Sequence, residues 1–217
     1  MTSRPAAGGG RWVEVDPARV GRWVEGFADR HGPHTTTVRE YGLLLTADDG
    51  ATAELYAPPG APAGDDVAGF VAAAVASRRI GLLLARKGAV AVGVADGVDL
   101  VVSKVDTRYV QGRTAAGGWS QQRFARRRDN QAKAAMGDAA DLAVRLLLPE
   151  VTRLTAVVCG GDRRAVDTVL ADRRLAPLVP LRAERLLDVP EPRHAVLVAA
   201  VTAARAVHIR LRDPEPG

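Results

Sequence analysis

The stretch "IGLLLARKGAVAVGVADGVDLVVSKV", residues 80–105, decides the fold of the larger part of this chain. Three apolar runs, at 80–85, 89–95 and 100–105, are separated by "RKG" and "ADGVD", which are rich in residues that favour turns. Short apolar runs bounded by such turn signals are typical of β-strands. The stretch therefore predicts three consecutive strands.

The segments around these strands alternate between helix and strand patterns. A helix is expected over 67–77, and after the strands comes a long helix whose apolar positions are Met136, Ala139, Ala140, Ala143, Leu146 and Leu147. A buried strand ("LTAVVC", 154–159), a helix with Asp162 as its N-cap (162–174), a last helix (193–206) and a last strand (207–211) follow. This alternation predicts an α/β fold with a mixed, mostly covered sheet and helices packed on it.

The N-terminal quarter has a different pattern. A short strand over 12–15 precedes a helix that starts with Asp16 as N-cap and Pro17 at its first position. Two β-like runs, 35–47 and 51–57, are joined by "DDG" and predict a hairpin. The tract "PPGAPAGDD", residues 58–66, is the best internal boundary. We therefore expect a disordered tail (1–10), a small α+β unit (11–62) and an α/β domain (66–213).

Composition excludes several classes of protein. Hydrophobic residues make up 47% of the 217 residues and charged residues 25%, as in an ordinary globular chain. Cys159 is the only cysteine and the four histidines are scattered, so we expect no disulfide, no metal and no cofactor. The longest nearly uncharged apolar run, 195–204, is too short to span a bilayer, and no apolar leader is present. A cytoplasmic monomer without membrane contact is the expectation.

The charge is concentrated in one segment. Residues 103–133 carry eight basic and two acidic side chains, a net +6, whereas the whole chain carries +5. A concentrated basic segment on a nearly neutral body is the pattern of a protein that binds a phosphate backbone. The alternative is a solvated helix face, but the acidic partners that would lie along such a face are nearly absent.

The same segment resembles a known family. "GGWSQQRFARRRDN" (117–130), together with "KVDTRYVQGR" (104–113), is similar to the catalytic loop and following helix of the eukaryotic and archaeal class 1 release factors. Their Gly-Gly-Gln tip and Arg-Phe-Ala-Arg match here as Gly117-Gly118 and residues 123–126, but Trp119 stands where the glutamine is expected. The displaced glutamine, Gln121, resembles instead the Vms-like release factors, peptidyl-tRNA hydrolases of ribosome rescue and quality control.

This resemblance implies a fold, a reaction and a site. The fold is that of the catalytic middle domain of class 1 release factors, which is RNase H-like, and the partners are the large ribosomal subunit and peptidyl-tRNA. Gln121 is implied to place a water against the ester, on a tip formed by Gly117 and Gly118, with Gln122 sharing the role. The residues implied to contact RNA are Arg113, Trp119, Ser120, Arg123, Arg126, Arg127 and Lys133. Two other functions stay open, cleavage of tRNA near its CCA end and a non-catalytic RNA-binding module.

Overall fold

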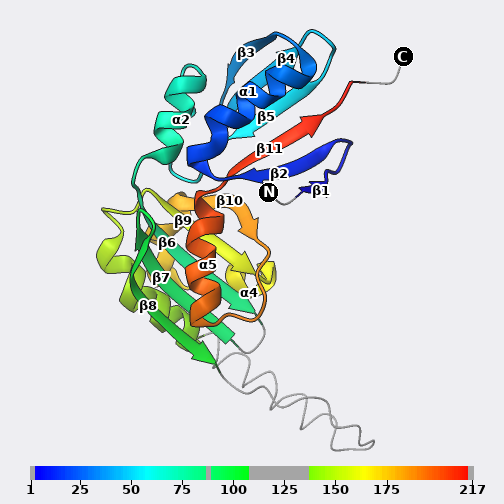
Figure 1. Ribbon diagram of the computed structural model, residues 1–217. Coiled ribbons are helices and arrows are strands. Elements are labelled where there is room, and N and C mark those ends of the chain that lie inside the picture. The colour runs from blue at the N-terminus through cyan, green and yellow to red at the C-terminus, as the bar shows by residue number, and fades with distance from the viewer. Residues whose placement is uncertain (1–2, 87–88, 108–136, 215–217) are drawn as a thin grey trace, which may run out of the picture. The chain divides into compact units, whose positions relative to one another are not determined.

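The computed structural model describes residues 3–86, 89–107 and 137–214 (Figure 1). The chain divides into two compact units, which we call unit 1 (1–78 with 202–217) and unit 2 (79–201). Each unit is built on its own β-sheet. Unit 1 is therefore assembled from both ends of the chain, and unit 2 from its middle.

Unit 1 contains a six-stranded antiparallel sheet in the order β1-β2-β11-β5-β4-β3. Its strands are β1 (Ser3–Pro5), β2 (Arg11–Val15), β3 (His34–Arg39), β4 (Gly42–Ala47), β5 (Thr52–Tyr56) and β11 (Val207–Arg212). Its helices are the 3-10 turn η1 (Pro17–Arg19), α1 (Val20–His31) and α2 (Val67–Val75). The predicted strand 12–15, the first helix with its Asp16 cap and the last strand are confirmed.

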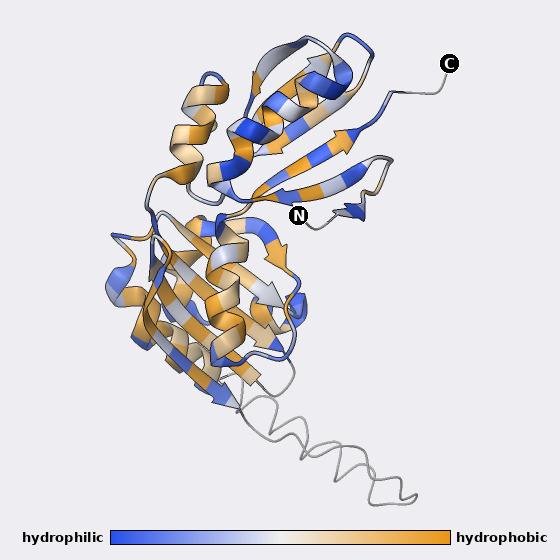
Figure 2. Cartoon of the chain, viewed as in Figure 1, coloured by the Kyte–Doolittle hydropathy of each residue, from blue (hydrophilic) through white to orange (hydrophobic). Residues whose placement is uncertain are grey.

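One face of the six-stranded sheet builds the core of unit 1. Alternate residues of β2, β4, β5 and β11 point to this face, as in Val13 and Val15 of β2 or Leu43 and Leu45 of β4. The helices contribute Trp23, Phe27 and Phe70 to the same core. Figure 2 shows the alternation of hydrophobic and hydrophilic residues along β11. A half-buried antiparallel sheet of this kind leaves its second face for polar and aromatic side chains.

The tract 58–66 lies within unit 1 and is not its end. Gly64 adopts a φ of +74°, and a Cβ there would lie 2.5 Å from the backbone nitrogen of Phe70, so the chain turns tightly into α2. Phe70 and Ala74 of α2 are fully buried in the core of unit 1. The chain therefore passes from unit 1 to unit 2 between Arg78 and Arg79. The predicted second domain (66–213) included α2 and β11, but both belong to unit 1.

Two further expectations for the N-terminal part need revision. Ser3–Pro5 form β1, which pairs with β2, where we expected a disordered tail. The turn between them uses Gly8, Gly9 and Gly10, which all have positive φ angles that suit glycine. The run 35–47 is two strands, β3 and β4, because the chain reverses at Glu40 and Tyr41. Periodicity alone cannot locate a turn that lacks glycine or proline at its centre.

Unit 2 contains a five-stranded sheet in the order β10-β9-β6-β7-β8. Its strands are β6 (Arg79–Arg86), β7 (Ala89–Asp96), β8 (Asp99–Thr107), β9 (Ala156–Gly161) and β10 (Arg182–Leu187). The three consecutive strands predicted from residues 80–105 form the antiparallel meander β6-β7-β8, and β9 and β10 add in parallel. The predicted mixed sheet and α/β class are confirmed.

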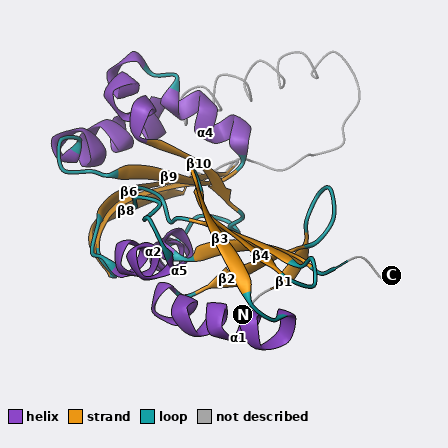
Figure 3. Ribbon diagram, turned by 90° about the horizontal axis from the view of Figure 1, so that it is seen from above, coloured by secondary structure: helices purple, strands orange, loops and turns teal. Residues whose placement is uncertain are grey.

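Both faces of the five-stranded sheet are covered (Figure 3). Leu83, Val92 and Val157 on one face pack with α4 (Arg163–Leu170), η3 (Arg173–Leu181) and the helix whose described part is 137–147, followed by η2 (Leu148–Glu150). On the other face lies α5 (His194–Arg205), whose Leu197 would lie 3.0 Å from a Cβ on Gly93. This explains why β6 and β7 are hydrophobic along almost their whole length (Figure 2).

Candidate functional site

The site residues predicted from the sequence lie in one segment, 108–136, outside the described residues. They are Arg113, Gly117, Gly118, Trp119, Ser120, Gln121, Gln122, Arg123, Arg126, Arg127 and Lys133. Phe124, which we expect to be buried, lies there too. Their roles stay predictions, and what the structure provides is the scaffold on either side of the segment.

The scaffold before the segment is strand β8. It pairs with β7 over nearly its full length, and Thr107, its last residue, lies opposite Ala89. β8 is the edge strand of the five-stranded sheet, and Val101 and Lys104 on it are exposed. Segment 108–136 therefore follows directly on a strand that is hydrogen-bonded to its neighbour.

The scaffold after the segment is the helix at 137–147. Of the predicted apolar face, Ala139, Ala140, Ala143 and Leu147 are at most 3% exposed, and Leu146 is half-buried against the same core. Met136 lies outside the described residues. Asp141 on its solvent side forms an ion pair of 2.7 Å with Arg174. Both ends of segment 108–136 are therefore attached to packed elements of unit 2.

The distribution of aromatic residues sets the segment apart from its scaffold. The chain contains nine Phe, Tyr and Trp residues. Six lie in residues 1–78, and the other three, Tyr109, Trp119 and Phe124, lie in segment 108–136. The described core of unit 2 is accordingly built of aliphatic side chains and Cys159 alone. Aromatic rings in this half of the protein are found only where the sequence predicts the site.

The turn "VVCGGDRR" has the structural role that its sequence indicates. Gly161 ends β9 with a φ of +94°, and a Cβ there would lie 2.4 Å from the carbonyl oxygen of Ala85. The carboxylate of Asp162 accepts hydrogen bonds from the backbone N–H groups of Arg164 and Ala165, which confirms it as the cap of α4. Two of the N–H groups that could bind an anion at this helix start are therefore already used.

Other groups with potential chemistry are dispersed. His31 pairs with Asp49 at 2.8 Å, and His208 lies 3.2 Å from Glu14. Burial raises the pKa of Cys159 to about 11, so its thiol is protonated at neutral pH. Among the described residues there is no group of three or more His, Cys, Asp or Glu side chains that could hold a metal ion. No helix in this part of the chain is long and apolar enough to cross a membrane.

Asp96 and Asp99 also have a local role. They face each other across the turn between β7 and β8, where Gly97 adopts a φ of +61°. Asp96 accepts a hydrogen bond of 2.9 Å from the guanidinium of Arg79, which lies opposite it on β6. The interpretation of "ADGVD" as a turn is confirmed.

Known proteins resemble this chain in sequence and in structure. A family model described as the Actinobacteria/chloroflexi VLRF1 release factor matches residues 78–210, whereas no curated protein matches the chain. Among solved structures, the archaeal translation termination factor aRF1 is 21% identical with a TM-score of 0.46, over 58% of this chain and 34% of that one. A second structure, described as an archaeal protein, is 20% identical with a TM-score of 0.42, over 56% and 32% of the two chains. The chain thus spans about a third of each of these structures.

The family match bears on the resemblance inferred from the loop. It covers more than half of the chain, including all of unit 2 and the whole of segment 108–136. It begins at Arg78, where unit 1 gives way to unit 2. The chain therefore belongs to the Actinobacteria/chloroflexi VLRF1 release factor family.

Proposed function

We propose that this protein is a peptidyl-tRNA hydrolase that frees nascent chains from stalled ribosomal complexes in the cytoplasm. The observation that carries the proposal is the family match over residues 78–210, because it includes the segment with the Gly-Gly tip and the displaced glutamine. The structure supports it by showing that this segment is inserted between two packed elements of unit 2.

The reaction needs little more from the protein than a well-placed water. The ester between peptide and tRNA is already activated, so holding the water in line with the carbonyl supplies most of the catalysis. In the proposed mechanism, the side-chain oxygen of Gln121 orients the water and its N–H group supports the oxyanion that develops. Gly117 and Gly118 let the backbone approach the RNA closely. None of these steps requires a shifted pKa or a metal ion.

The segment also contains groups suited to RNA. Arginine side chains bind phosphates and position the loop without reading a base sequence. Aromatic rings such as those of Tyr109 and Trp119 can stack on unpaired bases, like those of a tRNA 3′ end. Because the described core of unit 2 contains no aromatic residue, packing in that core does not explain why these rings occur here. Their position favours recognition of RNA.

The scaffold suits a loop that must enter a narrow site. Catalytic groups act best when they are mounted on rigid elements whose own side chains are fixed by packing. The strand β8 and the helix at 137–147 provide this, one through its ladder with β7 and the other through its five buried side chains. We infer that the two elements carry the loop as a rigid stem.

The products of the reaction test this proposal. Stalled complexes of the large subunit with peptidyl-tRNA are incubated with the purified chain, and the released tRNA is analysed by mass spectrometry. The proposal predicts an intact tRNA that ends in CCA with a free 3′ hydroxyl, together with free peptide. A shortened tRNA would identify an endonuclease, and absence of release a non-catalytic binding module; either result would overturn the proposal.

A further inference from the structure

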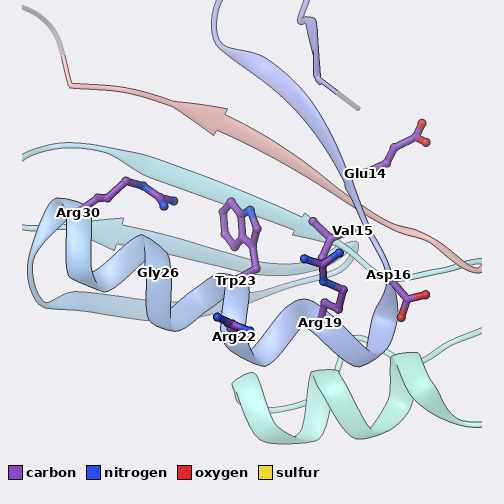
Figure 4. Close-up of a pocket in the computed structure, with 8 residues that line it drawn as sticks. All are labelled: Glu14, Val15, Asp16, Arg19, Arg22, Trp23, Gly26 and Arg30. Atoms are coloured by element: carbon purple, nitrogen blue, oxygen red, sulfur yellow. The ribbon is translucent and has the colours of Figure 1, made fainter. Parts of the chain in front are cut away.

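A basic groove lies along helix α1 in unit 1. It has an open volume of about 330 Å³, and Arg19, Arg22, Trp23 and Arg30 are among its lining residues. Arg19 and Arg30 approach Trp23 from opposite sides, whereas Glu14 and Asp16 point away from it (Figure 4). The floor of the groove is the ring of Trp23, which is 9% exposed and stacks on Phe27.

The helix period explains why the three arginines share one side. At 100° per residue, Arg19, Arg22 and Arg30 fall within about 80° of each other around the axis, with Gly26 between them. At a rise of 1.5 Å per residue, Arg22 lies about 4.5 Å along the axis from Arg19, and Arg30 about 12 Å further on. Gly26 has no side chain to fill the space between them. The result is a row of three arginine positions on the side of the helix that lines the groove.

These cations are not neutralised within the part of the chain that the structure describes. Arg19, Arg22 and Arg30 are exposed and form no ion pair with any described residue. The two acids that border the groove are engaged elsewhere. Glu14 contacts His208, and it belongs to the sheet face opposite Val13 and Val15. Asp16 accepts a hydrogen bond from the backbone N–H of Ala18.

The row is a local feature and not the result of a generally basic unit. Residues 1–78 and 202–217 contain ten Arg and no Lys against twelve Asp and Glu, so unit 1 as a whole carries a net charge of −2. Glu25 and Asp29 lie beside the row on α1 but form no ion pair with it in the described structure. Three free arginines in one groove of an acidic unit indicate a binding site for an anion.

We propose that this groove binds the phosphate backbone of RNA and gives the protein a second RNA contact, separate from the catalytic segment. The proposal rests on the proposed function, because the RNA is then that of the ribosomal complex on which the chain acts. Arginine suits this role because its planar fork of donors matches phosphate oxygens. An acidic protein segment fits less well, because protein interfaces depend on deep apolar anchors and Trp23 is almost fully buried.

Charge reversal tests the groove directly. Binding of fluorescent tRNA and of isolated large ribosomal subunits is measured at several salt concentrations for the wild type and for R19E/R22E. Loss of two phosphate contacts should weaken binding about tenfold or more and reduce the slope of log affinity against log salt by about 1.5. The matched control is R4E/R39E, because both arginines are exposed and lie on sheet rows that face away from α1. Its affinity should fall clearly less.

Two results would overturn the inference. One is equal loss of affinity in both double variants, which would mean that only the overall charge matters. The other is unchanged tRNA and subunit binding by R19E/R22E with lost binding of a poly-glutamate probe, which would assign the groove to an acidic protein. Because these readouts need no hydrolysis, they are repeated in the Gln121→Ala chain. The RNA-binding role of the groove can then be supported even if the chain does not hydrolyse peptidyl-tRNA. It can equally be refuted even if hydrolysis is observed.

Discussion

The two units use their sheets in opposite ways. Unit 1 covers one face of an antiparallel sheet with α1 and α2, and its core contains the large rings of Trp23, Phe27 and Phe70. Unit 2 covers both faces of a mixed sheet, and its described core is aliphatic apart from Cys159. Unit 1 therefore keeps one face of its sheet and the outer side of α1 for other contacts. In unit 2, both faces of the sheet are used for packing.

This difference shows where each unit can place functional groups. On the open face of unit 1, the rings of Trp12, Tyr41 and Tyr56 lie in contact with one another, with Tyr41 and Tyr56 stacked at 4.4 Å. Burial raises the pKa of Tyr56 to about 12, and its hydroxyl donates a 2.7 Å hydrogen bond to Glu54. Unit 2 has no such face, and the site proposed for it lies instead in the segment inserted between β8 and the helix at 137–147.

Truncation of buried side chains should have the largest effect on stability. It should also show whether the two units unfold independently. Phe70→Ala removes a fully buried ring from unit 1 and should cost about 3–5 kcal/mol, whereas Leu83→Ala in unit 2 should cost about 2–5 kcal/mol. Hydrogen exchange measured by mass spectrometry reports each unit through its own strands. Phe70→Ala should speed exchange mainly in β4 and β5, and Leu83→Ala mainly in β6 and β9. Equal acceleration of both sheets by either change would show a single cooperative unit.

Helix caps give a smaller and matched comparison. Asp66 caps α2 in unit 1 by accepting a 2.7 Å hydrogen bond from the N–H of Gly69, and Asp162 caps α4 in unit 2. Asp66→Ala and Asp162→Ala should each cost about 1 kcal/mol. The check is a urea unfolding curve for each variant, with exchange at the first turn of each helix as the local readout. Asn at either position should restore most of the loss, and failure of Asn to do so would mean that the cap is not the cause.

The smallest effect concerns acid stability in unit 2. Hydrogen bonding to Arg79 lowers the pKa of Glu150, whose carboxylate accepts 2.9 Å and 2.7 Å hydrogen bonds from Arg79 and Arg153. A lowered folded-state pKa stabilises the fold above the unfolded pKa of glutamate, and this contribution is lost as pH falls through the folded value. Glu150→Gln should therefore be less stable than the wild type at pH 7 and lose less stability between pH 5 and pH 3. Parallel pH profiles of the two melting temperatures would contradict this.

Sequence patterns predicted the central strands of unit 2 better than its edge strand β10. The continuous apolar runs of β6 and β7 identified the sheet because burial on both faces leaves no room for polar residues. Strand β10 was missed because "RAERLL" carries charges, as edge strands do, and follows a 3-10 stretch with two prolines. Its parallel pairing with β9 depends on tertiary contacts that no local pattern contains.

The predicted domain boundary shows a second limit of sequence patterns. Pro and Gly marked 58–66 as a linker, but burial of Phe70 keeps α2 in unit 1, and β11 returns from the far end of the chain to pair between β2 and β5. For the sites, the loop could be proposed from the sequence because its candidate residues are close together in the chain. The row of Arg19, Arg22 and Arg30 could be detected from the helical spacing of these arginines within a predicted helix. That spacing points to a site only because the structure shows the bordering acids, Glu14 and Asp16, in contacts with other groups.

One measurement tests the central claim, that Gln121 on the insertion of unit 2 positions the attacking water. Single-turnover release of peptide from stalled large-subunit complexes is compared for the wild type, Gln121→Ala and the control Gln131→Ala, which lies further along the same segment. We expect Gln121→Ala to release peptide about 10²-fold or more slowly at equal binding to the complex, because one transition-state contact is lost. Gln131→Ala should act at the wild-type rate. Release by Gln121→Ala at the wild-type rate would contradict the claim, and loss of release in Gln122→Ala alone would move the role to the neighbouring glutamine.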